Sequence, residues 1–407
     1  MGFIAFLEGK NEMDTEKLWT KDFILVSVMN FFIALTLYLL LVTTPSYALN
    51  EFHTSTSIAG LVSGIFIIGG LFGRLGIGRI IDNVENRKVL ILSALVFAIT
   101  SAFYLVANNL PLLILNRFIQ GMAFGVATTT LGTIVANIIP LHRRGEGIGY
   151  FMMSTIIATA IGPFLGILLL EYASFDIIFI FNLILSLLFP AISFTVSEPQ
   201  HILTKPEKTE NGGKFKISNF LEFKAIPISV VALIMSFAYS SVLTFISIYA
   251  EEIHLVEAAS MFFVVYAAVV LLSRPFSGRL LDSKGANIVM YPCIFIFAIA
   301  MLLFSQAKLG ITLLLAGALF GLGYGNFQSV AQAIAIKVAP LHKVGLATAT
   351  FFMFYDLGFG IGPYLFGLII PFTGYRNLYS IMVVVILAAI VLYYLVHAKK
   401  GQQTNTV

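Results

Sequence analysis

Residues 112–125 read Leu-Leu-Ile-Leu-Asn-Arg-Phe-Ile-Gln-Gly-Met-Ala-Phe-Gly and place Arg117 inside a segment apolar enough to cross a bilayer. A charge at the centre of a membrane helix costs at least about 2.5–3.5 kcal/mol, so Arg117 requires a partner, a cavity or water. Gly121 and Gly125 allow a neighbouring helix to approach closely. A structural alternative stays open: Pro111 begins the helix, and Arg117 then lies only about 9 Å inside it, close enough to snorkel to the interface.

The composition indicates a polytopic membrane protein. Hydrophobic residues make up 59% of the 407 residues and charged residues 11%, whereas about 25% of a soluble domain is charged. Apolar stretches of about 20 residues, which span about 30 Å as helices, recur twelve times. We place them at 22–46, 58–80, 89–108, 111–138, 147–171, 176–197, 226–250, 258–281, 288–306, 310–337, 344–371 and 376–397.

The longest polar interruption divides these spans into six and six. It is rich in lysine, glutamate, proline and glycine, which is typical of a linker. We therefore expect a six-helix bundle over 22–197, a cytoplasmic linker over 198–225 and a second six-helix bundle over 226–397. Residues 1–21 and 398–407 are expected to form cytoplasmic tails.

The two halves repeat at a constant offset of 200 residues. Such a repeat implies two similar bundles related by an axis along the membrane normal, because six spans return the chain to its starting side. The matching residues include Arg74 and Arg274, Gly78 and Gly278, Asp82 and Asp282, Gly121 and Gly321, Gly125 and Gly325, Pro140 and Pro340, and Gly162-Pro163 and Gly362-Pro363.

The basic residues predict the orientation. If both tails, the linker and the loops after even-numbered spans are cytoplasmic, nearly all 24 basic residues lie on the inner side. The exceptions are Arg117, Lys308 and Arg376. The outer loops carry glutamates and aspartates instead. This asymmetry predicts that both termini are cytoplasmic.

Residues at the inner ends of spans predict a gate. An aspartate there can accept hydrogen bonds from the positively polarised N-terminus of a helix in the other half, which would hold the cytoplasmic side shut. An ordinary charged loop is the alternative. The residues concerned are Gly78, Asp82, Arg87, Lys88, Gly278 and Asp282.

Proline and glycine predict a hinge or a seal in the fifth span. Pro163 removes a helical hydrogen bond and kinks the helix, while Gly162 and Gly166 allow tight packing. Gly362 and Pro363 are the counterparts in the second half. A merely tolerated kink is the alternative.

Asp356 is the carboxylate that we place nearest to the centre of a span. Burial disfavours an ionised carboxylate, which suits a site that gains and loses a proton. Its counterpart in the first half is Ile156, so the repeat does not require it. A structural acid bonded to a neighbouring helix is the alternative. At a similar depth we expect a substrate pocket that comprises Asp356, Asn30, Tyr38, Gln120, Tyr239, Tyr324, Asn326 and Gln328.

These motifs resemble those of the major facilitator superfamily, and most closely those of its twelve-span drug/proton antiporters. Arg117-x-x-Gln120-Gly121-x-x-x-Gly125 is similar to the helix 4 signature, in which the arginine is implicated in proton transfer. The helix 5 signature of exporters resembles Gly162-Pro163-x-x-Gly166, with Ala158 and Ile167 in place of glycines. The loop signature Gly-x-x-x-Asp-Arg-x-Gly-Arg-Arg resembles Gly78 to Lys88, with departures at Asn83 and Glu85.

The resemblance implies an all-α membrane protein of twelve transmembrane helices in two six-helix bundles. It further implies a secondary transporter without enzymatic activity, namely a proton-coupled exporter of small organic molecules that works by rocker-switch alternating access, as in multidrug resistance. Many such antiporters carry a carboxylate in helix 1 or 4. Helix 1 here has Asn30 instead, so we expect Asp356 and Arg117 to couple protons.

The expected partners are a small-molecule substrate, protons and the lipid bilayer. We expect no metal, cofactor or nucleic acid, and a monomer. The absence of a signal peptide, taken with the family, suggests a plasma or bacterial inner membrane.

Two other functions stay open. An uptake carrier or facilitator for a metabolite would share the fold, which does not decide direction. A non-transporting sensor or a membrane-embedded enzyme is disfavoured, because the spans contain no cluster of catalytic side chains. One central acid among aromatic residues fits lipophilic cations, but it also fits a neutral or zwitterionic metabolite.

Overall fold

A computed structural model describes residues 18–78, 84–140, 143–196, 221–340 and 343–398. The described residues are helical and contain no β-strand. The first half forms α2 (Lys21–Phe52), α3 (Thr56–Ile77), α4 (Asn86–Phe103), α5 (Leu110–Ile138), α6 (Arg144–Tyr172) and α7 (Phe175–Ser193). The second half forms α8 (Ile226–Glu252), α9 (Val256–Lys284), α10 (Asn287–Ser305), α11 (Gly310–Phe320), the π-helix η4 (Gly321–Gly325), α12 (Asn326–Lys337), α13 (Val344–Tyr393) and the π-helix η6 (Tyr394–Ala398).

Three helices of the first half, α2, α3 and α5, begin where short polar side chains cap them. The side chains of Thr20, Ser55 and Asn109 accept hydrogen bonds from the backbone N–H groups of Phe23, Ile58 and Leu112. Such caps satisfy donors that have no partner inside the helix. At these three starts the loop ends at a defined residue, and the apolar run that follows becomes a span.

Helix α13 makes two membrane crossings. Eleven helices of the described residues are long and apolar enough to cross a membrane, and the last, Val344–Val396, has 53 residues. It would reach about 80 Å if straight, far more than a bilayer's hydrocarbon core. Gly374 interrupts it with φ 70° and ψ 170°, values outside the helical region. The prediction of an all-α membrane protein with twelve spans is confirmed.

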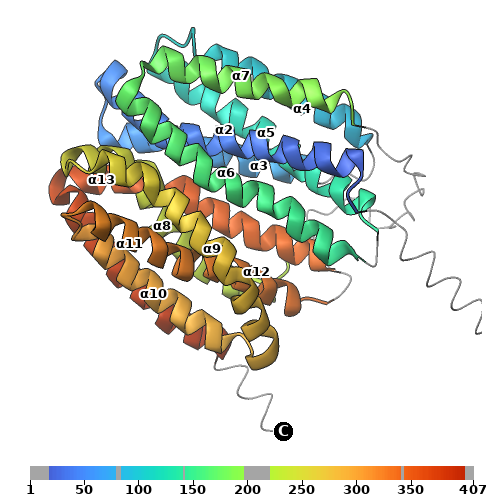
Figure 1. The fold of residues 1–407 in the computed structure, drawn as a ribbon. Coiled ribbons are helices and arrows are strands. Elements are labelled where there is room, and N and C mark those ends of the chain that lie inside the picture. The colour runs from blue at the N-terminus through green and yellow to red at the C-terminus, as the bar shows by residue number, and fades with distance from the viewer. Residues whose placement is uncertain (1–17, 79–83, 141–142, 197–220, 341–342, 399–407) are drawn as a thin grey trace, which may run out of the picture.

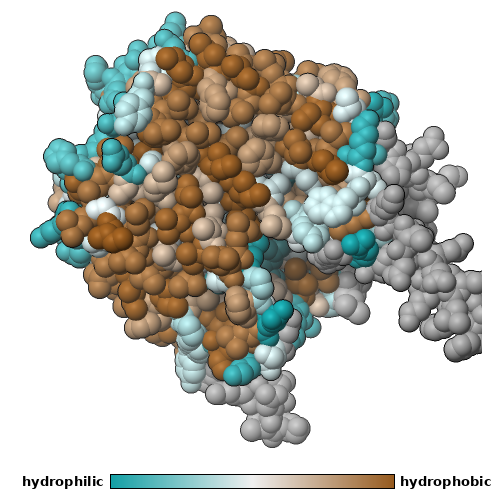
Figure 2. Space-filling view, viewed as in Figure 1, coloured by the Kyte–Doolittle hydropathy of each residue, from teal (hydrophilic) through white to brown (hydrophobic). Residues whose placement is uncertain are grey.

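The surface agrees with a membrane location. Figure 2 shows a wide hydrophobic belt between two hydrophilic ends. Large apolar side chains of the spans, such as Leu92, Ile99 and Val384, are exposed on the protein surface, where a bilayer would cover them. We call the end at which α7 stops and α8 starts the linker end, and the opposite end, where α2 meets α3, the far end.

The 200-residue repeat is visible in the backbone. The N–H of Arg143 donates to the Pro140 carbonyl at 2.9 Å, and the N–H of Lys343 donates to the Pro340 carbonyl at 2.8 Å. Gly121 lies against the carbonyl of Phe66, and Gly321 lies against that of Tyr266. The turns and the close helix contacts therefore recur in both halves.

The tenth span departs from the expected regular helix. Residues Gly321–Gly325 form a π-helical turn between α11 and α12. A π turn inserts one residue into a helix and often marks a functional site. Gly323 lies so close to the backbone of Phe297 that a Cβ atom would come within 2.6 Å of its nitrogen. The turn carries Tyr324 and sets the direction of its side chain.

The two halves meet mainly through α3 with α13, α6 with α9, and α2 with α8 (Figure 1). At the far end, the Thr56 hydroxyl donates to the Gly367 carbonyl at 2.7 Å. The hydroxyl groups of Ser46 and Ser247 lie 3.3 Å apart. Gly60 and Gly64 of α3 face the carbonyls of Pro363 and Gly360 so closely that Cβ atoms would lie 2.0 and 2.1 Å from those oxygens. These contacts close the far end between α3 and α13.

We predict that Gly64→Val opens the far end. A valine cannot fit against the Gly360 carbonyl, and over-packing costs about 1–3 kcal/mol, which lowers the ratio of closed to open molecules by a factor of about 5 to 160. The measurement is maleimide labelling of Ser46→Cys in a Cys293→Ser background, in membranes. Gly76→Val is the matched control, because no atom lies within 4 Å of its Cβ position. Equal labelling in the two variants would contradict the prediction.

Residues just before α8 are anchored to α13. The Glu222 N–H donates to the Thr350 hydroxyl at 2.9 Å, and the Lys343 ammonium lies 3.3 Å from the Glu222 carboxylate. Burial acts to raise the pKa of Glu222, but the Lys224 N–H and the Lys343 ammonium outweigh it and hold the pKa below its ordinary 4.5. The ionised carboxylate thus ties the start of the second half to the eleventh span.

The lowered pKa of Glu222 predicts a pH-dependent stability. A depressed carboxyl pKa stabilises the fold above the ordinary value of 4.5, and this contribution is lost as the pH falls through the lower folded-state pKa. We expect Glu222→Gln to lower the unfolding midpoint of detergent-purified protein at neutral pH and to flatten its fall in acid. Glu85→Gln, which removes an exposed pair with Lys88, is the control and should change little. Parallel pH curves for wild type and Glu222→Gln would disprove the assignment.

Candidate functional site

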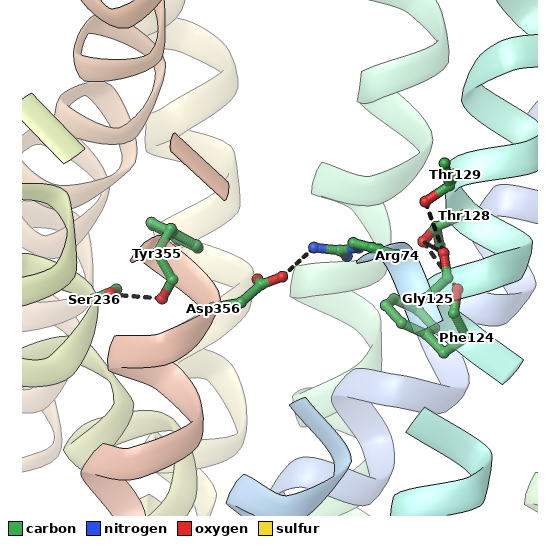
Figure 3. Close-up of polar contacts among 8 residues, drawn as sticks. All are labelled: Arg74, Phe124, Gly125, Thr128, Thr129, Ser236, Tyr355 and Asp356. Carbon is green, nitrogen blue, oxygen red and sulfur yellow. Dashed lines mark hydrogen bonds and ion pairs between the residues drawn. The ribbon is translucent and has the colours of Figure 1, made fainter. Parts of the chain in front are cut away.

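An ion pair joins the two halves inside the membrane domain. Arg74 of α3 donates to the Asp356 carboxylate of α13, as Figure 3 shows. The side chains keep 29% and 14% of their surface exposed. Along α3 and α13, the pair lies on the linker-end side of the glycine contacts that close the far end. It is the one ion pair between the halves among the described residues.

Neighbouring groups hold the two charges in place. The Arg74 guanidinium lies 5.9 Å from the centre of the Phe124 ring of α5, a favourable position for a cation. On the other side, the Ser236 hydroxyl of α8 donates to the Tyr355 carbonyl at 2.9 Å. Removing one partner of such a pair leaves an uncompensated charge, which is costly in a low-dielectric site. Arg74 and Asp356 are therefore a coupled pair.

A cluster of five tyrosines lies next to the ion pair. Tyr239 and Tyr324 stack with their ring centres 4.1 Å apart, and the hydroxyls of Tyr324 and Tyr355 lie 2.5 Å apart. Tyr266 stacks on Tyr239 at 6.0 Å. Tyr38 of α2 lies close enough to Asp356 and Arg74 for their charges to act on its hydroxyl group. We call these residues the tyrosine cluster; it brings hydroxyl groups from α2, α8, α9, η4 and α13 to one place.

The structure brings some of the predicted pocket residues together and not others. Tyr38, Tyr239, Tyr324 and Asp356 meet at the site. Sequence reasoning missed Arg74, Tyr266 and Tyr355 as members. A charge within an apolar span points to a functional residue, and Arg74 is such a charge, but its place near the inner end of the span makes it look like one of the cytoplasmic basic residues.

The predicted amide side chains serve contacts within one half. Asn30 donates to the hydroxyls of Ser154 and Thr155 on α6, both at 2.8 Å. Asn326 donates to Ser273 at 2.8 Å and accepts from Ser277 of α9 at 2.8 Å. Gln328 is half-buried on α12. We do not include Asn30 and Asn326 in the substrate site proposed below.

Arg117 is fully buried within the first half and does not snorkel. Its Nε donates to the Val62 carbonyl of α3 at 3.0 Å, and its guanidinium lies 4.5 Å from the centre of the Phe66 ring. The Tyr104 hydroxyl accepts a hydrogen bond from it at 3.4 Å. No carboxylate of the described residues pairs with Arg117. Its partners instead fix α3 against α4 and α5.

Gln120 belongs to the same buried network. Its Oε1 accepts from the Tyr104 hydroxyl at 2.6 Å, and its Nε2 donates to Ser101 at 3.0 Å. Both ends of the amide are therefore occupied between α4 and α5. We leave Gln120 out of the proposed substrate site.

The gate residues near the linker end are described in part. Asp82 and the side chain of Asp282 lie outside the described residues. Gly78 ends α3, and Gly278 lies on α9 with open space at its Cβ position. Arg87 donates to the Phe194 carbonyl at 2.8 Å, within the first half. Lys88 pairs with Glu85 at 2.7 Å. The latch between the halves stays a prediction.

The proline motifs of spans five and eleven pack closely. Gly162 and Gly166 lie against Tyr38 and Val42 of α2, where Cβ atoms would come within 2.7 and 2.6 Å. Pro163 lies inside α6, which continues through it. Gly362 lies against the Ser240 hydroxyl, and the Pro363 carbonyl meets Gly60 across the halves. No group of three potential metal ligands is found among the described residues.

We predict that Arg117→Lys destabilises the protein. A lysine ammonium cannot reach the Val62 carbonyl while stacking its charge over Phe66 as a planar guanidinium does. Lost hydrogen bonds to a buried charge cost about 1.5–3 kcal/mol. The measurement is the unfolding midpoint of detergent-purified protein, with Arg376→Lys as the control at the far end. An unchanged midpoint combined with lost proton coupling would instead place Arg117 in the proton pathway.

Comparison with known proteins places this geometry in a family. The family model of the Major Facilitator Superfamily matches residues 26–307 and 256–406. An uncharacterized MFS-type transporter of Methanocaldococcus jannaschii is 24% identical over 79% of this chain and 84% of its own length. A multi-drug resistance efflux pump PmrA homolog of Lactococcus lactis is 24% identical over 88% of this chain and 90% of its own. A bacterial homolog of the lysosomal transporter Spinster, solved inward-facing and unoccupied, aligns with a TM-score of 0.77 at 13% identity over 94% of this chain and 97% of its own.

Proposed function

Because the chain belongs to the Major Facilitator Superfamily, we propose that this membrane transporter is a proton-coupled exporter of small organic molecules. It works by rocker-switch alternating access. The Arg74–Asp356 ion pair carries the proposal, because it links the two halves through a group that a proton neutralises. The similarity to a multi-drug efflux pump homolog supports the export direction.

The ion pair supplies a physical route for coupling. An ionised Asp356 attracts Arg74 and ties α13 to α3. A proton on Asp356 removes that charge and weakens the tie, so proton binding changes the relative stability of the conformations. This structure, with the far end closed and the pair formed, corresponds to the deprotonated state that receives substrate.

The cycle follows from this assignment. With the far end open, Asp356 takes up a proton from the outside, and the halves rock to the other state. There the carboxyl releases its proton towards the linker end and pairs with Arg74 as substrate binds. The linker end is the cytoplasmic side, as the excess of basic residues predicts. Substrate then leaves when the far end opens again.

Other residues act on this cycle through the helices that they position. Arg117 holds the Val62 carbonyl of α3, and α3 carries Arg74, so Arg117 is a positioning residue for the pair. Gly162, Pro163 and Gly362 allow close packing at the moving interfaces. Asp82 and Asp282 latch the linker end when the far end opens.

We predict that Asp356→Asn abolishes proton coupling. The amide keeps the shape of the carboxyl but cannot carry a proton between the two sides, so substrate-triggered proton movement falls at least about tenfold. Proteoliposomes that contain a pH-sensitive dye measure this movement over a panel of cations, neutral compounds and anions. Glu257→Gln, a change at the far-end start of α9, is the control.

The same assay separates export from uptake. Antiport moves protons opposite to the substrate, whereas an uptake symporter moves both in one direction. Proton-driven transport that survives Asp356→Asn would end the assignment of Asp356. Substrate flux with no proton signal in wild type would identify a facilitator.

A further inference from the structure

The repeat relates the α3–α13 interface to the α9–α6 interface. A shift of 200 residues moves α3 onto α9 and relates α13 to α6, and both helix pairs are in contact. Arg74 then corresponds to Arg274, and Asp356 corresponds to Ile156. The first interface has both charges of an ion pair. The second has the arginine but a buried isoleucine, 8% exposed, in place of the acid.

Arg274 is a cation without a partner in the described part of the chain. Its side chain is half-buried, and its Nε–H is buried and makes no hydrogen bond. No carboxylate of the described residues lies within ion-pair distance. Tyr266, two helical turns earlier on α9, lies close enough for its hydroxyl group to interact electrostatically with the Arg274 guanidinium. Arg274 is therefore linked to the tyrosine cluster through Tyr266.

We propose that Arg274 binds the anionic group of the transported substrate, so that the cargo is a small aromatic carboxylate or a similar organic anion. The proposal rests on the proposed transport function and adds the class of substrate. A guanidinium favours carboxylates, because its planar donors match both oxygens. The missing acid at Ile156 leaves those donors free for a ligand.

The charge at the site favours an anion over a cation. With Asp356 ionised, Arg74 neutralises it, and Arg274 leaves a net positive charge. A cationic substrate would compete with Arg74 for Asp356 and would meet the like charge of Arg274. An organic anion instead compensates Arg274 without breaking the ion pair between the halves.

Aromatic side chains next to Asp356 fit the rest of such a substrate. Phe352 and Phe359 lie four residues before and three residues after Asp356, so they share its face of α13. Both are half-buried, whereas Tyr239 and Tyr324 behind them are buried. Half-buried rings on the face of α13 that carries Asp356 suit the aromatic part of such an acid.

Ligand binding to detergent-purified protein tests the proposal without protons or transport. The probes are two series of matched size: indole-3-acetate, indole-3-acetamide and tryptamine, and 4-hydroxyphenylacetate, its amide and tyramine. We expect the unfolding midpoint to rise with the anions at concentrations roughly tenfold lower than with the amides, and not to rise with the amines. Stabilisation by the amines that matches or exceeds that of the anions, or no stabilisation by either anion, would overturn the proposal.

Substitutions of Arg274 test whether this residue binds the anions. Arg274→Gln should weaken anion binding roughly tenfold or more, and Arg274→Lys should weaken it less, because the charge remains. Arg279→Gln, on the same helix at an exposed position, is the matched control and should bind like wild type. Equal anion binding by Arg274→Gln and wild type would remove Arg274 from the site.

Unfolding midpoints without ligand show whether each variant is folded. If Arg274→Gln is unfolded, Arg274→Lys decides, because it keeps the charge and loses the planar donors; anion binding equal to that of wild type would then remove the guanidinium from the site. The binding result is independent of the proton assay. Anion binding without proton coupling therefore refutes the antiport mechanism and not the substrate class.

Discussion

A charge inside a bilayer must be compensated, and here each half of the protein compensates the other. Arg74 lies in the first half and Asp356 in the second, and neither finds another ion-pair partner among the described residues. The two bundles are thus bound by a pair whose strength depends on one proton. A hydrophobic contact between the bundles would not respond to a proton, because apolar packing has no ionisable group.

The glycine contacts on the far-end side of the pair let it form. Gly60 and Gly64 bring α3 against the backbone of α13, so the shorter distance between the helices places Arg74 within reach of Asp356. The π turn Gly321–Gly325 and the Tyr324–Tyr355 contact then hold α13 from its other side. Backbone packing and the ion pair both act on α13, so a change in either one alters the contact between α3 and α13.

The sequence predicts the fold well because hydropathy alone locates a membrane span. Ten predicted spans match helices to within a few residues at most ends, and the last two appear as one helix broken at Gly374. The site was harder to predict. Tyr239 and Tyr324 were expected in the pocket, but Arg74 and Asp356 are 282 residues apart, and only the arrangement in space reveals their pairing. Gln120 and Asn30 show the converse, because a polar residue in a span can serve packing within one half as well as a pocket.

Arg117 and Arg274 show why burial alone does not identify a binding residue. Arg117 is the more buried, and its Nη2 also makes no hydrogen bond, but its other nitrogens donate to the Val62 carbonyl and the Tyr104 hydroxyl, and its guanidinium lies over the Phe66 ring. Its charge is spread over fixed dipoles that belong to the fold. Arg274 has a neighbouring tyrosine and no acceptor for its Nε–H. A membrane protein retains an uncompensated cation at a cost, and a ligand that supplies the missing charge recovers that free energy upon binding. The repeat shows which arginine lacks a partner, because Arg74 faces Asp356 in one interface and the equivalent Arg274 has Ile156 at the acid's position in the other.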